Sequence, residues 1–204
     1  MHRIPKDYLV MDLETTGVNQ SKDRILEIGV MIVRGQNPIK NISKLLNQQI
    51  EIPEEITRIT GIDNKMVERA DPPADGLRWF TFQLGDLSVV GHNILMFDHP
   101  FLLEECKRNG VRIFLPPEKV IDTLVLFKGW RLGWEWKEQE TFLEYASRVL
   151  GAKVKGLKYN LRFACQEMGV ETEGIRTHRA QGDILLTHNL LQKMVGILPN
   201  VQFA

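Results

Sequence analysis

Near the start of the chain, hydrophobic residues form short runs separated by turn-forming residues. Runs of this kind, rich in β-branched residues and bounded by Gly, Pro, Asn or Asp, predict β-strands. The predicted strands are Tyr8–Glu14, Ile25–Val33 and Ile39–Ile50. Because short connections join these runs, we expect the three strands to form an antiparallel meander.

After Ile50 the hydrophobic residues recur mainly at the three- and four-residue steps of helices. The predicted helices, several of which end at a glycine, are 53–60, 74–84, 97–108, 137–150, 157–168 and 177–195. Two short apolar runs, Leu87–Val90 and Val120–Ile121, predict two further buried strands. This order predicts the α/β fold class, with a mixed five-stranded sheet in which parallel strands join the meander and helices flank the sheet.

Composition is that of a globular chain with a full-sized core. Of its 204 residues, 43% are hydrophobic and 25% are charged, which excludes disorder, collagen and low complexity. The 26 basic residues balance the 26 acidic ones, which argues against tight, charge-driven binding of duplex DNA. The two cysteines, Cys106 and Cys165, fit buried thiols in a reducing compartment. With no signal peptide and no long apolar run, we expect a soluble, cytoplasmic protein without membrane association.

Two acidic residues stand at the end of the first predicted strand. Asp12 and Glu14 are two positions apart, so both side chains point to the same face while Leu13 points into the core. They lie at the carboxyl end of the strand, where open α/β sheets bind their ligands. Asp12 and Glu14 are therefore candidate functional residues.

Two further acidic residues follow later in the chain. Asp98 comes after the junction between a predicted strand and a predicted helix, and Asp183 lies on the final predicted helix, five residues after His178. Five helical steps would leave the side chains of His178 and Asp183 about 140° apart and about 7.5 Å apart along the axis. We therefore expect His178 to guard a cleft whose floor Asp183 helps to form.

Each of these residues also has an ordinary structural interpretation. Asp12 and Glu14 fit a solvated strand end beside a turn. Asp98 fits a helix N-cap, and Asp183 fits a solvated position on a helix. His178, taken alone, fits a surface histidine.

Three motifs in order point to one enzyme family. They are Asp12-Leu13-Glu14-Thr15-Thr16-Gly17, His92-Asn93 with Phe97-Asp98, and His178 with Asp183 five residues on. Together they resemble the motifs of the DEDDh (DnaQ-like) 3′–5′ exonucleases, the family of the bacterial polymerase III proofreading subunit, RNase T and oligoribonuclease. Ile59–Ile62 and Asp122-Thr123 agree as lesser features, and the resemblance runs from Tyr8 to Val195. It implies a ribonuclease-H-like fold.

The resemblance also implies a chemistry. The implied reaction is metal-dependent 3′–5′ hydrolysis of phosphodiester bonds at a single-stranded or frayed 3′ end, which releases nucleoside monophosphates. His178 would be the general base, and two Mg²⁺ or Mn²⁺ ions would be bound by Asp12, Glu14, Asp98 and Asp183. Charge physics supports the same ligands, because two carboxylates about 4 Å apart repel by about 4 kcal/mol at an effective dielectric of about 20. Converging carboxylates therefore need cations or protons, and oxygen ligands select hard ions.

The resemblance further implies residues that bind the substrate. The backbone and hydroxyls of Thr15 and Thr16 would contact the 3′-terminal nucleotide, with Asn93 and Phe97 shaping its pocket. Phe97 fits a plain core residue equally well.

Two features depart from the compact members of the family. The spacing from Asn93 to Asp98 is one residue longer than in the proofreading subunit, and a segment of about 129–156 is inserted within the single domain 1–204. The inserted segment is predicted to be helical and holds Trp130, Trp134 and Trp136, and residues 128–158 carry seven basic side chains, Lys155 among them, against four acidic ones. The tryptophans fit a base-stacking surface for a single strand, but packing of the insertion onto the domain or a subunit contact is the favoured interpretation.

Two other kinds of function stay open beside the enzyme. One is a proofreading or repair subunit that is active mainly within a polymerase assembly. The other is a non-catalytic nucleic-acid-binding module of the same fold, against which the presence of all five reactive residues counts. The expected partners are the 3′ ends of single-stranded DNA or RNA, with a polymerase or repair protein, or a second copy of the chain, as further candidates.

Overall fold

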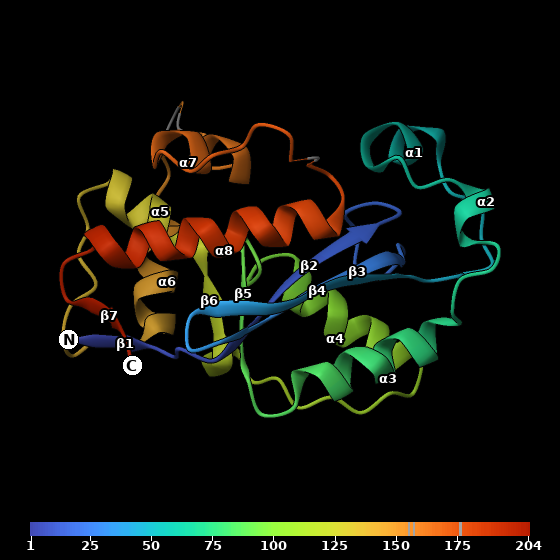
Figure 1. The fold of residues 1–204 in the computed structure, drawn as a ribbon, viewed down its shortest axis with the longest axis horizontal. Coiled ribbons are helices and arrows are strands. Elements are labelled where there is room, and N and C mark those ends of the chain that lie inside the picture. Colours follow the sequence, from blue (N-terminus) through green and yellow to red (C-terminus); the bar gives the residue numbers. More distant parts are fainter. Residues whose placement is uncertain (155, 157, 176) are drawn as a thin grey trace.

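The computed structural model describes residues 1–154, 156, 158–175 and 177–204. At its centre is a five-stranded sheet with the order β4-β3-β2-β5-β6 (Figure 1). The strands β2 (Tyr8–Thr15), β3 (Ile25–Arg34) and β4 (Asn37–Leu45) form an antiparallel meander. The strands β5 (Ser88–Gly91) and β6 (Val120–Asp122) extend the sheet in parallel beside β2. The predicted mixed sheet is confirmed.

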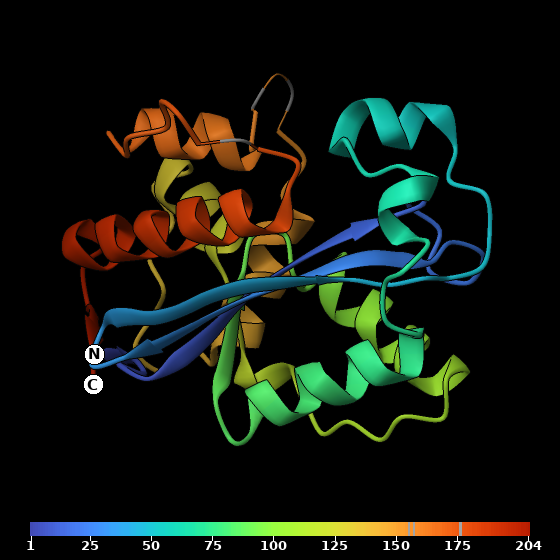
Figure 2. The same cartoon turned by 45° about the vertical axis from the view of Figure 1, so that its right-hand side comes forward.

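Helices cover both faces of this sheet (Figures 1 and 2). The helices α3 (Pro73–Leu84) and α4 (Asp98–Arg108) bury their apolar sides against one face. The other face is covered by α5 (Thr123–Arg131), α6 (Phe142–Gly151), α7 (Leu161–Glu167) and α8 (Ala180–Ile197). Two short helices, α1 (Glu54–Thr60) and α2 (Asn64–Val67), follow β4 and pack a small third cluster.

The two hydrophobic clusters divide the side chains of β2 by strict alternation. Leu9, Met11 and Leu13 face α3 and α4, whereas Tyr8 and Val10 face the α8 side. A strand places every second side chain on the same face. The face that carries Tyr8 and Val10 therefore also carries Asp12 and Glu14, and α8 crosses that face.

Three predicted helices begin later than their hydrophobic spacing indicated. The helix predicted from Lys137 begins only at Phe142, because Thr141 and Glu144 form a reciprocal capping box there. The helix predicted over 157–168 begins at Leu161, where the side chain of Asn160 caps it; Leu157 lies outside the described residues. The helix predicted from Thr177 begins at Ala180. In the first two cases a polar N-cap residue fixes the start of the helix after the periodic pattern has already begun.

The sequence analysis did not predict several elements. They are α2, α5, a single 3₁₀ turn (Pro117–Lys119), and a two-stranded parallel sheet of β1 (His2–Ile4) and β7 (Val201–Phe203). Polar residues interrupt both β1 and β7, so neither shows the short apolar run by which β6, also three residues long, was predicted. In the parts of the chain that the structure describes, no helix combines the length and the apolar character needed to cross a bilayer.

The tryptophans of the inserted segment differ in their contacts. The Trp136 ring stacks on His2 at 3.7 Å and on Tyr145 at 5.8 Å between ring centroids, and its indole nitrogen donates to the Glu140 carbonyl. Trp130 and Trp134 remain 38% and 37% exposed. Trp136 thus packs α6 against the first strand, as the packing interpretation expected, while the other two rings stay partly open to solvent. Lys155, one of the basic residues counted in this segment, lies outside the described residues.

Candidate active site

The centre of the sheet positions the first two carboxylates. Asp12 and Glu14 lie near the carboxyl end of β2, and hydrogen bonds of the antiparallel ladder pair Asp12 with Gly29 and Glu14 with Glu27 on β3. Glu14 is only 9% exposed. The alternative of a solvated strand end does not fit this buried position.

The first turn of α8 brings a third carboxylate to the same place. Asp183 lies in that turn, is 9% exposed, and its Oδ2 accepts the backbone N–H of His178 at 2.9 Å. One oxygen from each of Asp12, Glu14 and Asp183 lies within 4.8 Å of the other two. The structure therefore joins residues that are about 170 positions apart in sequence into one acidic cluster.

Close approach of α8 to the sheet depends on a glycine. A Cβ atom added to Gly29 would lie 2.6 Å from the Cβ of Ala180, well inside van der Waals contact. Gly29 is the ladder partner of Asp12, and Ala180 is the first residue of α8. The helix can lie over Asp12 because neither residue has a large side chain.

The fourth predicted carboxylate lies beside this cluster. Asp98 is the first residue of α4, is 3% exposed, and its Oδ1 accepts the backbone N–H of Leu13 at 3.0 Å. The ladder between β2 and β5 ends at Val10, so the amide of Leu13 would otherwise be unpaired on that side. Phe97, not Asp98, is the capping residue of α4, so the N-cap interpretation of Asp98 is wrong.

His178 lies in a different setting from the one predicted. It is exposed and precedes α8, with a positive φ of 59°, so the expected five helical steps to Asp183 do not exist. The helix begins after Arg179, and the Asp183 carboxylate accepts a hydrogen bond from the segment before it, as residues in a first helical turn often do. The two residues therefore meet through the backbone of His178.

His178 and two residues of the acidic cluster, Asp12 and Asp183, line one pocket of about 470 Å³. Its lining includes Asp12, His178 and Asp183 together with residues at the start of α7. Among the residues that the structure describes, the lining consists of Asp12, His92, Asn160, Leu161, Arg162, Thr177, His178 and Asp183. The predicted arrangement, a histidine beside a cleft that Asp183 helps to form, is present, although the helical geometry predicted for it is wrong.

Burial and mutual repulsion raise the pKa values of the clustered carboxylates. Burial, with the charges of neighbouring carboxylates, raises the pKa of Asp12 well above its ordinary value. Burial and then the charge of Asp183 raise the pKa of Glu14 to about 8. Burial raises the pKa of Asp98 to about 8, although the Leu13 amide acts in the opposite direction. Burial also raises the pKa of Asp183, against the hydrogen bond from His178.

These carboxylates fit a divalent cation. The donors that converge are oxygen atoms, the ligand type that Mg²⁺ and Mn²⁺ prefer. Their raised pKa values show that the negative charge is not compensated within the chain, and a cation would compensate it. The cluster of Asp12, Glu14 and Asp183 can therefore hold a hard metal ion, with Asp98 next to it.

The loop before Asp98 is held by a buried carboxylate. Asp122, at the end of β6, accepts the backbone N–H groups of Asn93, Leu95 and Leu124 at 2.8, 3.1 and 2.9 Å. Asn93 has a positive φ of 62°, which Asn tolerates better than most residues. Asp122 therefore shapes the turn that leads from β5 into α4.

His92 connects the same loop to the pocket. Its Nε2 donates to the Tyr159 carbonyl at 2.7 Å, and its Nδ1 lies 3.0 Å from the Thr123 hydroxyl. Burial lowers the pKa of His92 to about 4, so the ring is neutral at pH 7. His92 thus anchors the segment next to Asn160, which lines the pocket.

The four residues predicted to bind substrate lie around the cluster, outside the lining of the 470 Å³ pocket. The Thr15 hydroxyl donates to the Gly17 carbonyl at 2.6 Å, and the Thr16 hydroxyl accepts the Arg24 amide at 2.9 Å. Phe97 is partly buried against the α3–α4 cluster, with its ring centroid 5.5 Å from that of Phe101. The fourth of these residues, Asn93, lies in the turn held by Asp122. Their roles stay predictions.

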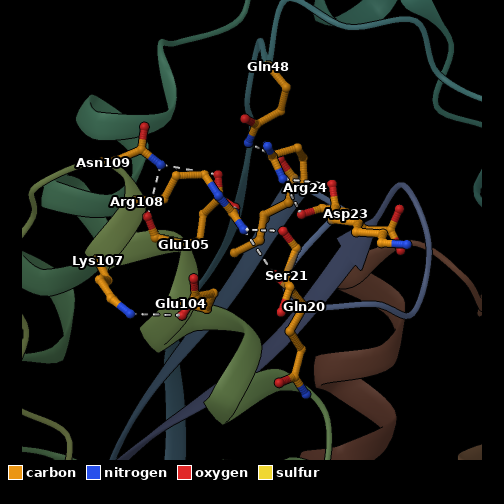
Figure 3. Close-up of polar contacts among 12 residues, drawn as sticks. Gln20, Ser21, Asp23, Arg24, Gln48, Glu104, Glu105, Lys107, Arg108 and Asn109 are labelled. Carbon is orange, nitrogen blue, oxygen red and sulfur yellow. Dashed lines mark hydrogen bonds and ion pairs between the residues drawn. The ribbon is translucent and has the colours of Figure 1, made fainter.

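The loop that follows Thr16 is tied to α4 (Figure 3). Arg108 donates to the carbonyls of Gln20 and Ser21 at 3.0 and 3.2 Å and pairs with the fully buried carboxylate of Glu105. Inside the loop, Asp23 accepts the Asn19 amide at 2.7 Å. These contacts hold the loop at the carboxyl end of β2.

Two charged residues next to the cluster were not singled out from the sequence. Glu27 on β3 is 1% exposed and forms an ion pair with Arg179, the residue between His178 and α8. Burial alone would raise the pKa of Glu27, but hydrogen bonds from Arg179 and Ser43 outweigh it and hold the pKa below its ordinary value. Glu27 could have been recognised in the sequence as a lone glutamate inside the apolar run 25–33, because a charge in a buried strand needs a partner.

Comparison with known proteins identifies the family of the chain. The model of the RNase_T family, described as exonuclease, matches residues 9–191. A PolC-type DNA polymerase III from Latilactobacillus sakei is 28% identical over 188 residues, which are 92% of this chain and 11% of that protein. The 3′–5′ exonuclease DinG of Staphylococcus aureus is 33% identical over 121 residues, which are 59% of this chain and 13% of that protein. The chain thus spans about a tenth of the length of these curated relatives.

Solved structures show the same fold. Escherichia coli Exonuclease I in complex with a dA16 oligonucleotide superposes with a TM-score of 0.69 at 18% identity, over 93% of this chain and 40% of that one. Exonuclease X in complex with 5′ overhanging duplex DNA superposes with a TM-score of 0.62 at 22% identity, over 93% of this chain and 91% of that one. The predicted ribonuclease-H-like fold is confirmed.

Proposed function

The chain belongs to the RNase_T exonuclease family, and from this premise we propose that it is a metal-dependent 3′–5′ exonuclease. Its substrate is a single-stranded or frayed 3′ end, and its products are nucleoside monophosphates. The observation that carries the proposal is the meeting of Asp12, Glu14 and Asp183 within 4.8 Å, beside a pocket that Asp12 and Asp183 line together with His178. The similarity to a 3′–5′ exonuclease of Staphylococcus aureus supports the direction of cleavage.

The carboxylates have the role of metal ligands in this proposal. Asp12, Glu14 and Asp183 would hold Mg²⁺ or Mn²⁺, and Asp98 would complete the set for two ions. Bound divalent ions make water a stronger nucleophile and stabilise the leaving oxygen of a phosphodiester. Because the cations supply the positive charge, a chain with no net charge can still bind a polyanion.

His178 has the role of general base. Its imidazole would accept a proton from the attacking water, the role in which histidine is the most frequent side chain of enzymes. The residue lies at the edge of the pocket, exposed to solvent, so the proton can pass on to bulk water. Arg162, which also lines the pocket, supplies a positive charge that a substrate phosphate can approach.

Degradation of an oligonucleotide with a 5′ label tests the proposal. With Mg²⁺ we expect a ladder of products that shorten from the 3′ end, and we expect EDTA or Asp12→Ala to abolish it. Asp86→Ala, which removes an exposed aspartate far from the cluster in sequence, is the matched control and should leave the ladder unchanged. A ladder that persists in EDTA or in the Asp12→Ala protein would refute the assignment.

The choice between DNA and RNA is tested in the same assay. Rates are compared on single-stranded DNA, single-stranded RNA and a primer with a mismatched 3′ end. A pocket that uses a 2′-hydroxyl would favour RNA, whereas one that cannot accept it would favour DNA. Faster removal of the mismatched end than of a matched end would support proofreading.

A second candidate function is that of a subunit or domain in a polymerase or repair assembly. The similarity to a PolC-type polymerase, of which this chain covers 11%, favours it. Co-elution with a larger partner, together with activity that rises on binding it, would support this candidate. Full activity of the isolated chain, taken as a single domain 1–204, would count against it.

A further inference from the structure

We propose that Glu27 and Arg179 are positioning residues whose ion pair fixes the start of α8 over β2 and so brings Asp183 to Asp12 and Glu14. The proposal rests on the proposed function in one respect, namely that these carboxylates bind a metal ion. Neither Glu27 nor Arg179 would need to touch the ion or the substrate. Their effect would pass through the position of the helix.

Glu27 and Arg179 form a two-pronged ion pair, which we call the clamp. The Nε and one terminal nitrogen of Arg179 donate to the two carboxylate oxygens of Glu27, each at 3.0 Å. Such two-pronged bonds constrain both distance and direction, unlike a single point contact. The same carboxylate accepts the Ser43 hydroxyl at 2.7 Å and the Ala180 amide at 3.3 Å. It therefore holds the strand β4, the residue before α8 and the first residue of α8 together.

The position of the clamp in the sheet explains why it acts on the carboxylate cluster. Glu27 is the ladder partner of Glu14, and Gly29, two residues on, is the ladder partner of Asp12. Arg179 follows His178 directly and caps α8. The clamp thus joins β3, the strand beside the two β2 carboxylates, to the segment that carries His178 and Asp183.

Charge gives a second reason to assign the pair to positioning. An ion pair in a buried site adds little stability compared with apolar side chains of similar size, because both charges lose their hydration. Placing one more carboxylate beside an acidic cluster is unfavourable as well, and Glu27 is almost fully buried there. The Glu27–Arg179 pair therefore differs from an apolar replacement in the geometry that it imposes, and not in the stability that it adds.

The variant that tests this removes the clamp but keeps the core filled. In Glu27→Met/Arg179→Met, apolar side chains of similar length replace both charges, and replacement of a buried pair by apolar residues is tolerated in other proteins. We expect metal-free thermal unfolding close to that of the unmodified protein. We expect the affinity for Mn²⁺, measured by titration calorimetry without nucleic acid, to fall 10- to 100-fold, the usual effect of losing a residue that orients a metal ligand.

The matched control is a second two-pronged pair that is remote from the cluster. Arg148 on α6 donates to both oxygens of Glu140, at 2.8 and 2.7 Å. Glu140→Met/Arg148→Met should leave the affinity for Mn²⁺ unchanged. The same affinity for Mn²⁺ in the Glu27→Met/Arg179→Met variant as in the unmodified protein would overturn the proposal.

A conservative variant decides the question if the double variant does not fold. Arg179→Lys keeps the positive charge but offers only one compact donor in place of the planar fork. We expect about a tenfold loss of Mn²⁺ affinity, and an unchanged affinity would overturn the proposal. Because calorimetry needs no turnover, this test is separate from that of the function: a protein that binds Mn²⁺ but degrades no oligonucleotide would refute the exonuclease and leave the clamp supported.

Discussion

The strand half and the helix half of the carboxylate site are assembled by different interactions. In the strand half, Asp12 and Glu14 are fixed by the backbone ladder at the centre of the sheet and by simple alternation along β2. In the helix half, the positions of His178 and Asp183 depend on side-chain contacts such as the ion pair of Arg179 with Glu27, 152 residues away in sequence. The strand half follows from local pattern, whereas the helix half depends on how one helix docks.

The loop that presents Asp98 belongs with the strand half. Asp98 accepts a hydrogen bond from the backbone of β2 itself, and Asp122 holds the preceding turn by three backbone amides. Three of the four carboxylates are thus tied to the sheet or its direct extensions. Only the fourth carboxylate, Asp183, is therefore placed by the way in which α8 docks on the sheet. The comparison predicts that changes to the helix half affect metal binding more than they affect the sheet.

The largest effect is expected from Asp183→Asn. The amide keeps the size of the side chain but removes the charge that a cation needs, so we expect activity on an oligonucleotide to fall about 10³-fold, equivalent to about 4 kcal/mol of the barrier. The sheet should stay intact, which circular dichroism checks. A variant with more than a tenth of the original activity would contradict the role of the helix half.

A smaller loss of activity is expected from His178→Asn. Asparagine tolerates the positive φ of 59° at this position, so the backbone bond to Asp183 is kept while the imidazole is removed. We expect kcat to fall about 10²-fold, as for loss of a general base, with the calorimetric affinity for Mn²⁺ unchanged. If metal binding falls instead, His178 acts on the ligands and not on the proton.

Gly29→Ala tests the docking of α8 by a change on the side of the sheet. The added methyl group would lie 2.6 Å from the Ala180 Cβ, so the start of α8 must move away from β2. We expect about a tenfold loss of Mn²⁺ affinity and about 1–3 kcal/mol of stability, measured by urea unfolding. Gly151→Ala, at a position with open space around the added Cβ, is the control. Equal metal affinity in both variants would show that the docking distance is not critical.

The last prediction concerns the unchanged protein, in which we expect stability without metal to depend on pH. The pKa values of Glu14 and Asp98 are both raised to about 8 in the folded protein, from ordinary values of 4.5 and 3.8. The folded state therefore keeps protons that the unfolded chain releases, so stability is greatest below about pH 4 as far as these groups decide it and declines as the pH rises to about 8. In EDTA we expect each of the two groups to contribute a decline on the order of 1 kcal/mol per pH unit.

Metal addition completes that measurement. Saturating Mg²⁺ should raise stability most at pH 8, because it binds the ionised carboxylates of the folded state. Urea unfolding at pH 5.5, 7 and 8.5, with and without Mg²⁺, checks both statements. A stability that does not depend on pH in EDTA would mean that the carboxylates are compensated within the chain.

The sequence alone was sufficient for most of the sheet and for the identity of the candidate residues. The meander, the two short parallel strands and most helices follow from periodicity, and the motifs around Asp12, Asp98 and Asp183 were identified by their resemblance to those of a known family. Where prediction was wrong, a polar side chain competed with periodicity: Thr141 and Asn160 cap helices that were predicted to begin earlier. At α8, the chain before Ala180 is held by contacts to β3 instead of by helical hydrogen bonds.

What the sequence determined is therefore the face on which each strand residue lies and the kind of atom that each motif offers, because both depend on neighbours a few residues away. What only the tertiary structure decided is that Asp183 meets Asp12, that His178 lies before α8 and not on it, and that Glu27 and Arg179 join the two halves. These depend on a close approach between β3 and α8, which Gly29 permits. Contacts between residues about 150 positions apart leave no periodic trace in the chain, since their distance is set by packing and not by the geometry of any one element.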